Sequence, residues 1–501
     1  MNIFDYFFSY SKDLKKGFLL GPAEQISYSE LYEKGLKLAN YLNKKIGENQ
    51  NIILTSQNSV FFLIAYLGIM KSGNVCVPLN PIIEQENLDF ILNTTESKNV
   101  FAPRKISSKY SFSDAKIFEE INLDEILEYP VQKENNLTDD IDENQLAQIL
   151  FTSGSTGLPK GVMLSHKNLA ANTESIIKYL QLKSDDIIEI VLPFYYCYGL
   201  SLLHTHLKVG GSIVLNNSFV FLGSIFSDLE KYKCSGFAGV PSHFQILLRK
   251  SKSFMDREFP ELRYFTQAGG KLHNVFIKEL VEAFPDKQCF VMYGQTEATA
   301  RLSYLPPEFV STKMGSIGKG IPNVTLEVFN KNDKPVKVGE VGEIVAKGDN
   351  IMLGYFNEPE SNKLTIKNGW LYTGDMAEKD EDGYIYLVAR KKEIIKVGGK
   401  RISPKEIEEV IVSIPEVVDC TIEGVFDEVL AETIKATIVL TDNMDQERGK
   451  EIILSTCRSK LAMYKIPQII EFKKRLAVNQ SGKKVASQSL PSQKKQIKQQ
   501  Q

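Results

Sequence analysis

The sequence predicts an α/β fold in which apolar strands alternate with amphipathic helices. Apolar runs that are typical of strands are found at 51–56, 186–193, 211–217, 261–267 and 287–294. Helical patterns lie between some of these strands, for example at 242–252 and 272–284. This alternation favours layered α/β subdomains with largely parallel sheets. From about residue 325 the pattern changes to short strands with turns, which predicts a smaller β-barrel-like subdomain at about 325–391.

A second domain is expected to begin near residue 392. A Lys- and Gly-rich segment there precedes Ser403 as a helix N-cap, Pro404 at the first helical position and Glu406 closing a capping box. We therefore divide the chain into a large N-terminal domain at 1–391 and a small α+β domain at 392–488. The last residues, 489–501, are polar and are expected to form a disordered tail.

Length and composition exclude several classes of protein. The chain has 501 residues, of which 43% are hydrophobic and 24% charged, so it can bury a large core. Sixty basic residues against 62 acidic ones give no reason to expect a nucleic acid or anionic-membrane partner. Six cysteines without CxxC or a close pair indicate reduced thiols rather than a disulfide or zinc framework.

No segment is expected to cross a membrane. The longest apolar run, Val60–Met70, is shorter than the about 20 residues that span a bilayer, and it predicts a buried helix. The first residues carry Asp5 within an apolar stretch and have no basic run before it, unlike a signal peptide. We therefore expect a cytoplasmic protein.

The most informative motif is LFTSGSTGLPKG at 150–161. Small residues let backbone N–H groups converge on an anion, hydroxyls add donors and Lys160 adds charge, as a triphosphate requires. It is not the common P-loop, which would need Gly at 159 and Ser or Thr at 161. A flexible linker is the alternative, but the flanking apolar segments argue against it. The loop residues are Thr152, Ser153, Gly154, Ser155, Thr156 and Gly157.

This loop resembles the phosphate-loop signature of the adenylate-forming (AMP-binding) superfamily, which includes acyl-CoA synthetases, nonribosomal adenylation domains and luciferase-like enzymes. Further signatures follow in the family's order over roughly 330 residues. The first is MYGQTEATA at 292–300, where the resemblance implies that Tyr293 contacts adenine, Thr296 the α-phosphate and Glu297 Mg²⁺. Gly294 and Gln295 belong to the same nucleotide site. Alone, the motif would be interpreted more readily as a surface turn that carries an acidic residue.

The resemblance extends to the ribose and to the adenine. In AGGKL at 268–272, Gly269 and Gly270 are implied to let the backbone approach adenine. Asp375 in YTGD matches a carboxylate that accepts hydrogen bonds from both ribose hydroxyls. Arg390 matches a residue that contacts the ribose.

The C-terminal signatures imply a mobile domain that carries a catalytic lysine. Lys392 matches the hinge, and Gly398 and Gly399 match the passage for the thiol arm, although a basic run of this kind is often a solvated face. Lys483 matches the lysine that reaches the α-phosphate and the substrate carboxylate. The usual proline is replaced by Ala477, and the charged residues that normally follow the lysine are missing.

The implied reaction has two steps. A carboxylate attacks ATP·Mg²⁺ to give acyl-AMP and pyrophosphate, and a thiol of CoA or of a carrier-protein phosphopantetheine then takes the acyl group. Catalysis is assigned to Lys160, Thr296, Glu297 and Lys483, which position and neutralise charge.

The acid is expected to bind in an apolar or aromatic pocket formed by Tyr196, Gly199, Val240 and His243. No Asp occurs between 192 and 204 to hold an α-ammonium group, which argues against an amino acid. His204 and His206 form an HxH pattern, but on an apolar segment they are expected to be structural.

Two other functions remain open. One is a stand-alone amino-acid ligase that loads a separate acyl or peptidyl carrier protein, since the sequence shows no carrier motif. The other is a non-catalytic nucleotide-binding regulator, which the intact Lys160, Glu297, Asp375 and Lys483 argue against. Carboxylate-dependent pyrophosphate exchange would distinguish an enzyme from a regulator.

Overall fold

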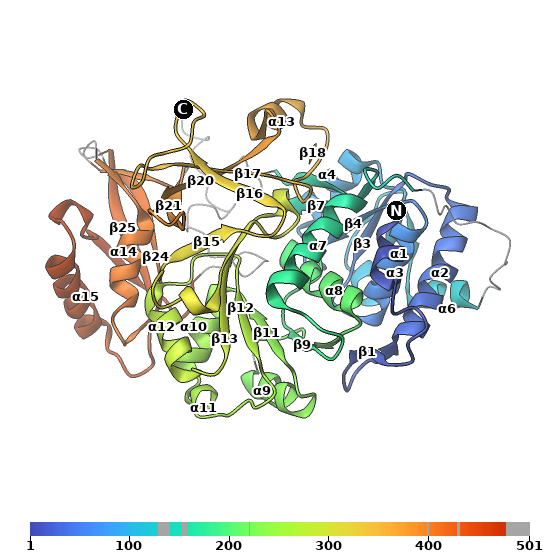
Figure 1. Cartoon of the computed structure of the whole chain (residues 1–501), viewed down its shortest axis with the longest axis horizontal. Helices are drawn as coiled ribbons and strands as arrows, with labels where there is room; N and C mark the ends of the chain where they lie inside the picture. Colours follow the sequence, from blue (N-terminus) through green and yellow to red (C-terminus); the bar gives the residue numbers. More distant parts are fainter. Residues whose placement is uncertain are drawn as a thin grey trace.

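The computed structural model describes residues 1–128, 141–152, 158–219, 221–391, 393–397, 400–427 and 431–476. These residues form three sheets, with helices packed against them (Figure 1). The five-stranded sheet and its helices lie at the end of the molecule opposite the N-terminus. We call the described residues from 393 onward the C-terminal lobe.

The first sheet is built mainly from the N-terminal residues. Its central strands are parallel, as the alternating pattern predicts, and only its β18–β8–β7 edge is antiparallel. In spatial order it contains β18 (Gly354–Tyr355), β8 (Lys160–Ser165), β7 (Leu146–Thr152), β4 (Val75–Leu79), β3 (Asn51–Thr55), β5 (Asn99–Phe101) and β6 (Lys116–Phe118). The predicted helix at 60–70 is α3 (Val60–Lys71), and its residues from Phe61 onward are buried.

The second sheet has fourteen strands, of which thirteen follow one hydrogen-bonded path and β19 (Ile366–Lys367) pairs with β20 (Trp370–Lys379) beside it. Its parallel part comprises β13 (Gln288–Tyr293), β12 (Tyr264–Gln267), β11 (Gly236–Gly239), β9 (Ile187–Ile190), β10 (Ser212–Leu215) and β1 (Gly17–Leu20), and β2 (Ile26–Ser27) closes that edge. The antiparallel part comprises β14 (Ser303–Leu305), β15 (Ser316–Gly320), β21 (Ile385–Arg390), β20 (Trp370–Lys379), β17 (Gly342–Gly348) and β16 (Val324–Phe329), with β19 (Ile366–Lys367) beside β20. Helices α10 (Pro241–Lys250) and α12 (Asn274–Ala283) match the predicted helical segments.

The β-rich segment at 325–391 is therefore joined to the α/β part by a continuous sheet path. Strand β15 pairs with β14 on one side and with β21 on the other. Gly318 permits this arrangement, because its φ is +81° and an added Cβ would overlap the carbonyl oxygen of Tyr304. The short strands that begin near residue 325 therefore lie mainly in the antiparallel part of a sheet that also contains the parallel strands of the α/β part.

The C-terminal lobe contains α14 (Pro404–Val412) and α15 (Gln446–Lys460) against a mixed sheet. The strands of this sheet are β23 (Lys400–Ile402), β22 (Ile395–Val397), β25 (Ala431–Leu440), β24 (Val417–Asp427) and β26 (Ile469–Phe472). Ser403 is the N-cap of α14 and Pro404 its first residue, as predicted.

The predicted capping box at α14 is wrong. The Ser403 hydroxyl donates to the carbonyl oxygen of Val388 at 2.5 Å instead of accepting from the first turn of the helix. The Glu406 carboxylate pairs with Lys465 at 2.6 Å. Both side chains are thus held by tertiary contacts that a local pattern cannot reveal.

Two further expectations concern membranes and cysteines. Among the described residues, no helix has both the length and the apolar character needed to cross a bilayer. None of the six cysteines, all of which are described, forms a disulfide in the structure.

Candidate active site

The two ends of the predicted phosphate loop are held together by antiparallel strands. Thr152 ends β7 and faces Lys160 at the start of β8. The Thr152 hydroxyl lies 3.4 Å from the carbonyl oxygen of Lys160. The strand pair therefore brings Thr152 and Lys160 to one place on the sheet. The loop residues between them, Ser153, Gly154, Ser155, Thr156 and Gly157, lie outside the described residues.

Tyr355 links the loop lysine to the predicted magnesium ligand. Its hydroxyl donates to Glu297 Oε1 at 2.8 Å, and Lys160 Nζ lies 5.3 Å from the centre of its ring. Burial, followed by the charge of Glu297, raises the pKa of Tyr355, so it remains a donor. Sequence reasoning missed Tyr355, which is 58 residues from Glu297 and belongs to none of the motifs that were recognised.

Lys160 is also held by the segment that follows Tyr355. Its ammonium group donates to Ser361 Oγ at 2.6 Å and lies 3.6 Å from Glu358 Oε2. Ser361 is in α13 (Pro359–Thr365). An ammonium group has three donors, so Lys160 can keep a protein partner and still contact an anion.

The predicted adenine and ribose residues form one network, in which Tyr293 and Asp375 are buried and Arg390 is exposed. Tyr293 donates to Asp375 Oδ2 at 2.7 Å, and Arg390 Nε lies 3.0 Å from Asp375 Oδ1. Asp375 and Arg390 are paired across β20 and β21, and Asp375 is only 5% exposed. The carboxylate of Asp375 raises the pKa of Arg390, while burial raises the pKa of Tyr293. The structure therefore unites three residues that were predicted from separate motifs.

The segment after Tyr293 is a tight and strained turn. An added Cβ on Gly294 would overlap the carbonyl oxygen of Ala300. Thr299 has φ +65°, a costly conformation for a β-branched residue. The Gln295 side-chain nitrogen is buried and has no hydrogen-bond partner among the described residues. Strain and an unpaired polar group are features that accompany ligand sites.

Two of the predicted catalytic residues lie in the short helix of this turn, η1 (Thr296–Ala298). Thr296 Oγ1 lies 3.6 Å from Cys197 Sγ, whereas Glu297 is bound by Tyr355. No group of three or more metal-ligating side chains occurs within the part of the chain that the structure describes. A single carboxylate fits Mg²⁺, which commonly uses one or two carboxylates together with substrate phosphates.

The second glycine motif turns the chain between β12 and α12. Gly269 has φ +86°, and the Gly270 carbonyl oxygen accepts from Gln267 Nε2 at 2.7 Å. An added Cβ on Gly270 would lie 3.3 Å from the ring of Pro241, the first residue of α10. The segment predicted to meet adenine therefore packs against the helix that carries predicted acid-pocket residues.

The predicted acid-pocket residues lie on α8 (Cys197–Val209) and α10. Tyr196 is the N-cap of α8 and packs against Tyr195, with ring centres 4.8 Å apart. Gly199 has a packing role, because an added Cβ would overlap the carbonyl oxygen of Pro193. Val240 is the buried N-cap of α10.

His243 is the polar member of that set. Its ring stacks on Phe219 at 4.0 Å between ring centres, and burial lowers its pKa to about 4. Its Nδ1 is buried without a hydrogen-bond partner among the described residues. A neutral imidazole at neutral pH is compatible with an apolar or aromatic acid site.

Sequence reasoning also missed a buried cation next to this region. Arg301 is 2% exposed, and its guanidinium group stacks on the ring of Tyr198 at 4.1 Å. Tyr198 in turn donates to the carbonyl oxygen of Thr266 at 2.9 Å. The available signal was the position of Arg301 immediately after the MYGQTEATA motif.

The HxH pair is structural, as expected. His204 Nε2 lies 2.8 Å from the Tyr66 hydroxyl, and His206 Nδ1 lies 2.9 Å from the carbonyl oxygen of Leu202. Both rings are buried. Of the remaining predictions, Lys392, Gly398, Gly399 and Lys483 lie outside the described residues.

Comparisons with known proteins agree with the motif order. The sequence profile of the family described as AMP-binding enzyme matches residues 11–356, and that of the AMP-binding enzyme C-terminal domain matches residues 406–483. The oxalate–CoA ligase of Arabidopsis thaliana is 31% identical over 452 residues, which cover 86% of each chain. A long-chain-fatty-acid–CoA ligase of Bacillus subtilis is 26% identical and covers 92% of this chain and 89% of its own. ATP-bound MatB from Rhodopseudomonas palustris superimposes with a TM-score of 0.85 at 27% identity, covering 96% of this chain and 97% of its own.

Proposed function

The chain belongs to the AMP-binding enzyme family, and on that premise we propose that it is an ATP-dependent acid–CoA ligase. It activates a carboxylic acid as an acyl-adenylate with release of pyrophosphate, and it then transfers the acyl group to the thiol of CoA. The observation that carries this function is the chain Lys160–Tyr355–Glu297. These residues bring a cation, a hydroxyl donor and a carboxylate together at Lys160, which follows the predicted phosphate loop in the sequence.

In the first step, the protein aligns the reactants and stabilises charge. The acid is already ionised at neutral pH, so no protein base is needed. Lys160 and the loop 152–157 bind the phosphates, Thr296 donates to the α-phosphate and Tyr293, with Gly269 and Gly270, borders the adenine. Glu297 would hold Mg²⁺, which would supply positive charge to offset that of the departing pyrophosphate.

The ribose is assigned to Asp375 and Arg390. The two oxygens of Asp375 already accept from Tyr293 and Arg390, but each carboxylate oxygen has a further lone pair for a ribose hydroxyl. Tyr293 and Arg390 thus hold the carboxylate in place before the nucleotide binds. This preorganisation reduces the entropy that binding must offset.

The second step is assigned to the small domain at 392–488. Lys483 serves the first step, and rotation about Lys392 then presents Gly398 and Gly399 to the incoming thiol arm. The acid is a small carboxylic acid held by Tyr196, Val240 and His243, with Gly199 shaping the start of α8. A separate carrier protein is an alternative acceptor to CoA, and the test below includes it.

The decisive test is carboxylate-dependent ATP–pyrophosphate exchange with fatty, aryl, hydroxy, amino and dicarboxylic acids. Exchange with one class of acid, and its loss in Lys483→Ala, is the expected result. Thioester formation is then measured with CoA and with phosphopantetheinylated carrier proteins. ATP binding without exchange for any acid would instead support a nucleotide-binding regulator, and exchange followed by transfer only to a carrier would exclude CoA as the acceptor.

A further inference from the structure

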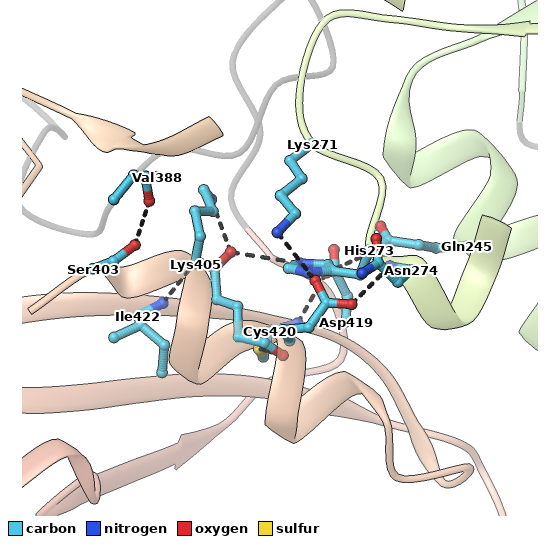
Figure 2. Close-up of polar contacts among 12 residues, drawn as sticks. Gln245, Lys271, His273, Asn274, Val388, Ser403, Lys405, Asp419, Cys420 and Ile422 are labelled. Carbon is cyan, nitrogen blue, oxygen red and sulfur yellow. Dashed lines mark hydrogen bonds and ion pairs between the residues drawn. The ribbon is translucent and has the colours of Figure 1, made fainter. Parts of the chain in front are cut away.

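Glu409 is the centre of a polar contact between the C-terminal lobe and the rest of the protein. Its Oε2 lies 3.0 Å from His273 Nδ1 and 3.3 Å from Lys271 Nζ, and its Oε1 accepts from the Asn274 amide at 2.7 Å. Glu409 lies on α14, whereas its three partners lie on the loop before α12 and at its first residue. Figure 2 shows these partners grouped where the two parts of the chain meet.

The contact is partly buried and rich in charge. His273 is 1% exposed, and its other nitrogen, Nε2, lies 3.5 Å from Glu408 Oε2. Glu408 is held within its own lobe by Lys405 at 2.8 Å and by the Ile422 amide at 3.2 Å. An imidazole that faces a carboxylate at each nitrogen can donate to both only in its cationic form.

A second polar contact joins the lobe to α10. Gln245 Nε2 donates to Asp419 Oδ1 at 2.9 Å, and Arg249 donates to the carbonyl oxygen of Pro415 at 3.2 Å. Asp419 also accepts from the Cys420 amide at 2.9 Å, so its carboxylate is fixed on β24. Two separate segments of the rest of the protein, residues 271–274 and α10, therefore make polar contacts with the lobe.

Both of these segments begin at residues assigned to the ligand site. Gly269 and Gly270, predicted to border adenine, directly precede Lys271 and His273. Val240 and His243, predicted to border the acid, lie just before Gln245 on α10. Gly270 packs on Pro241, so the two segments also touch each other. If ligand binding shifts either segment, the shift would be transmitted to a contact with the lobe that lies only a few residues further along the chain.

We propose that Glu409 is a positioning residue that sets the orientation of the C-terminal lobe for one of the two steps. It does so through its contacts with Lys271, His273 and the Asn274 amide. This proposal rests on the two-step function given above. A lobe that serves both steps must adopt two orientations, and a contact made in only one of them biases the balance between them. Loss of the contact therefore alters the two steps in opposite directions.

The test compares Glu409→Ala with Glu406→Ala as a matched control. Glu406 is on the same helix but pairs with Lys465 inside the lobe, so its loss leaves the contact between the parts intact. The first step is measured as pyrophosphate exchange, and the second as thioester formation from CoA and preformed acyl-adenylate. We expect Glu409→Ala to change the ratio of the two rates about tenfold, the size expected when a charge-assisted hydrogen bond is lost.

A double-mutant cycle checks that the effect belongs to this contact. His273→Ala and Glu409→Ala together should shift the logarithm of the ratio by less than the sum of the two single shifts, because the two residues share one interaction. If both rates fall by one factor in Glu409→Ala, or if Glu406→Ala shifts the ratio as much, the positioning role is wrong. Should Glu409→Ala fail to fold, Glu409→Gln keeps the size of the side chain and replaces it in the same comparison.

Hydrogen exchange separates this proposal from the proposed function. The Asn274 amide donates to Glu409, so a peptide covering residues 272–276 should exchange faster in Glu409→Ala and unchanged in Glu406→Ala. If the wild-type protein catalyses neither step, the proposed function fails, and the exchange result still decides whether Glu409 holds the lobe. Equal exchange in wild type and Glu409→Ala would overturn the positioning role by itself.

Discussion

Asp375 and Arg390 face each other across β20 and β21, with Arg390 Nε 3.0 Å from Asp375 Oδ1. Tyr293 reaches the other oxygen of the same carboxylate from β13. Three motifs that are far apart in the sequence thus meet at one buried acid. Asp375 is therefore the residue that connects the three predicted parts of the site.

Replacing Asp375 by Asn should weaken ATP binding. The amide loses the charge that pairs with Arg390 and one of the two acceptor oxygens. We expect the Kd for ATP to rise about 10- to 100-fold, as for the loss of a charged hydrogen-bond partner. Isothermal titration calorimetry measures the change. Tyr293→Phe, which leaves the carboxylate in place, should have a smaller effect, and an unchanged Kd in Asp375→Asn would contradict the ribose assignment.

Replacing Tyr355 by Phe should slow the first step while leaving the fold intact. The ring still packs near Lys160, but the hydrogen bond to Glu297 is lost. We expect pyrophosphate exchange to fall about tenfold and to need more Mg²⁺, because Glu297 is no longer oriented. Tyr386→Phe is the control, since its hydroxyl makes only a 3.4 Å contact with Asp380. Equal rates in the two variants would show that Tyr355 is not needed at the site.

The contact at Glu409 should also affect stability as a function of pH. Burial alone would raise the pKa of Glu409, but the His273 hydrogen bond and charge, the Lys271 charge and the Asn274 amide bring it to about 2, below its ordinary value of 4.5. A lowered pKa in the folded state gives stability that is complete above pH 4.5 and is lost as the pH falls towards 2.

Urea unfolding of wild type and Glu409→Gln at a series of pH values measures this. The difference in the free energy of unfolding between the two proteins should shrink as the pH falls from about 4.5 to 2. A difference that does not depend on pH would mean that the charge of Glu409 is not stabilised in the folded state.

Gly318→Ala should be far more harmful than Gly339→Ala. Both glycines have positive φ, at +81° and +76°, so both substitutions incur backbone strain. Only at Gly318 does the added methyl group overlap another backbone, that of Tyr304, whereas Gly339 has open space. We expect a loss of about 1 kcal/mol at Gly339 and of about 3 kcal/mol or more at Gly318. Denaturant unfolding measures both, and similar losses would show that the β14–β15 contact can relax.

Local patterns predicted much of the fold. Alternating apolar runs located β3 and β12 as well as helices α3, α10 and α12. The family motifs also named the residues that meet at Asp375. Apolar periodicity and each single motif are properties of short stretches of chain. They can therefore be recognised without knowing which distant segments come into contact.

The features that were missed depend on contacts between distant segments. Tyr355 meets Glu297 because distant segments come together: β18 pairs with β8, and the Met352 amide donates to the carbonyl oxygen of Glu297 at 2.9 Å. No recognised motif includes Tyr355. The Ser403 hydroxyl donates to the carbonyl oxygen of Val388 and does not cap its own helix. The pairing of β15 with β21, which joins the β-rich segment to the α/β part, likewise leaves no local signal in the sequence. The assignments of Lys392, Gly398, Gly399 and Lys483 remain predictions.

The strand pairing described above also determines what a movement of the C-terminal lobe would disrupt. Among the described residues, the five strands of the lobe pair only with one another, so no backbone ladder joins the lobe to the other two sheets. A rotation of the lobe would therefore break no strand pairing. It would break contacts made by side chains, such as Lys271–Glu409 and Arg249–Pro415. Partly exposed ion pairs weaken as salt rises, since the Debye length falls from about 10 Å at 0.1 M to about 3 Å at 1 M. On the proposed two-step function, we therefore expect ionic strength to alter how readily the lobe changes between its two orientations.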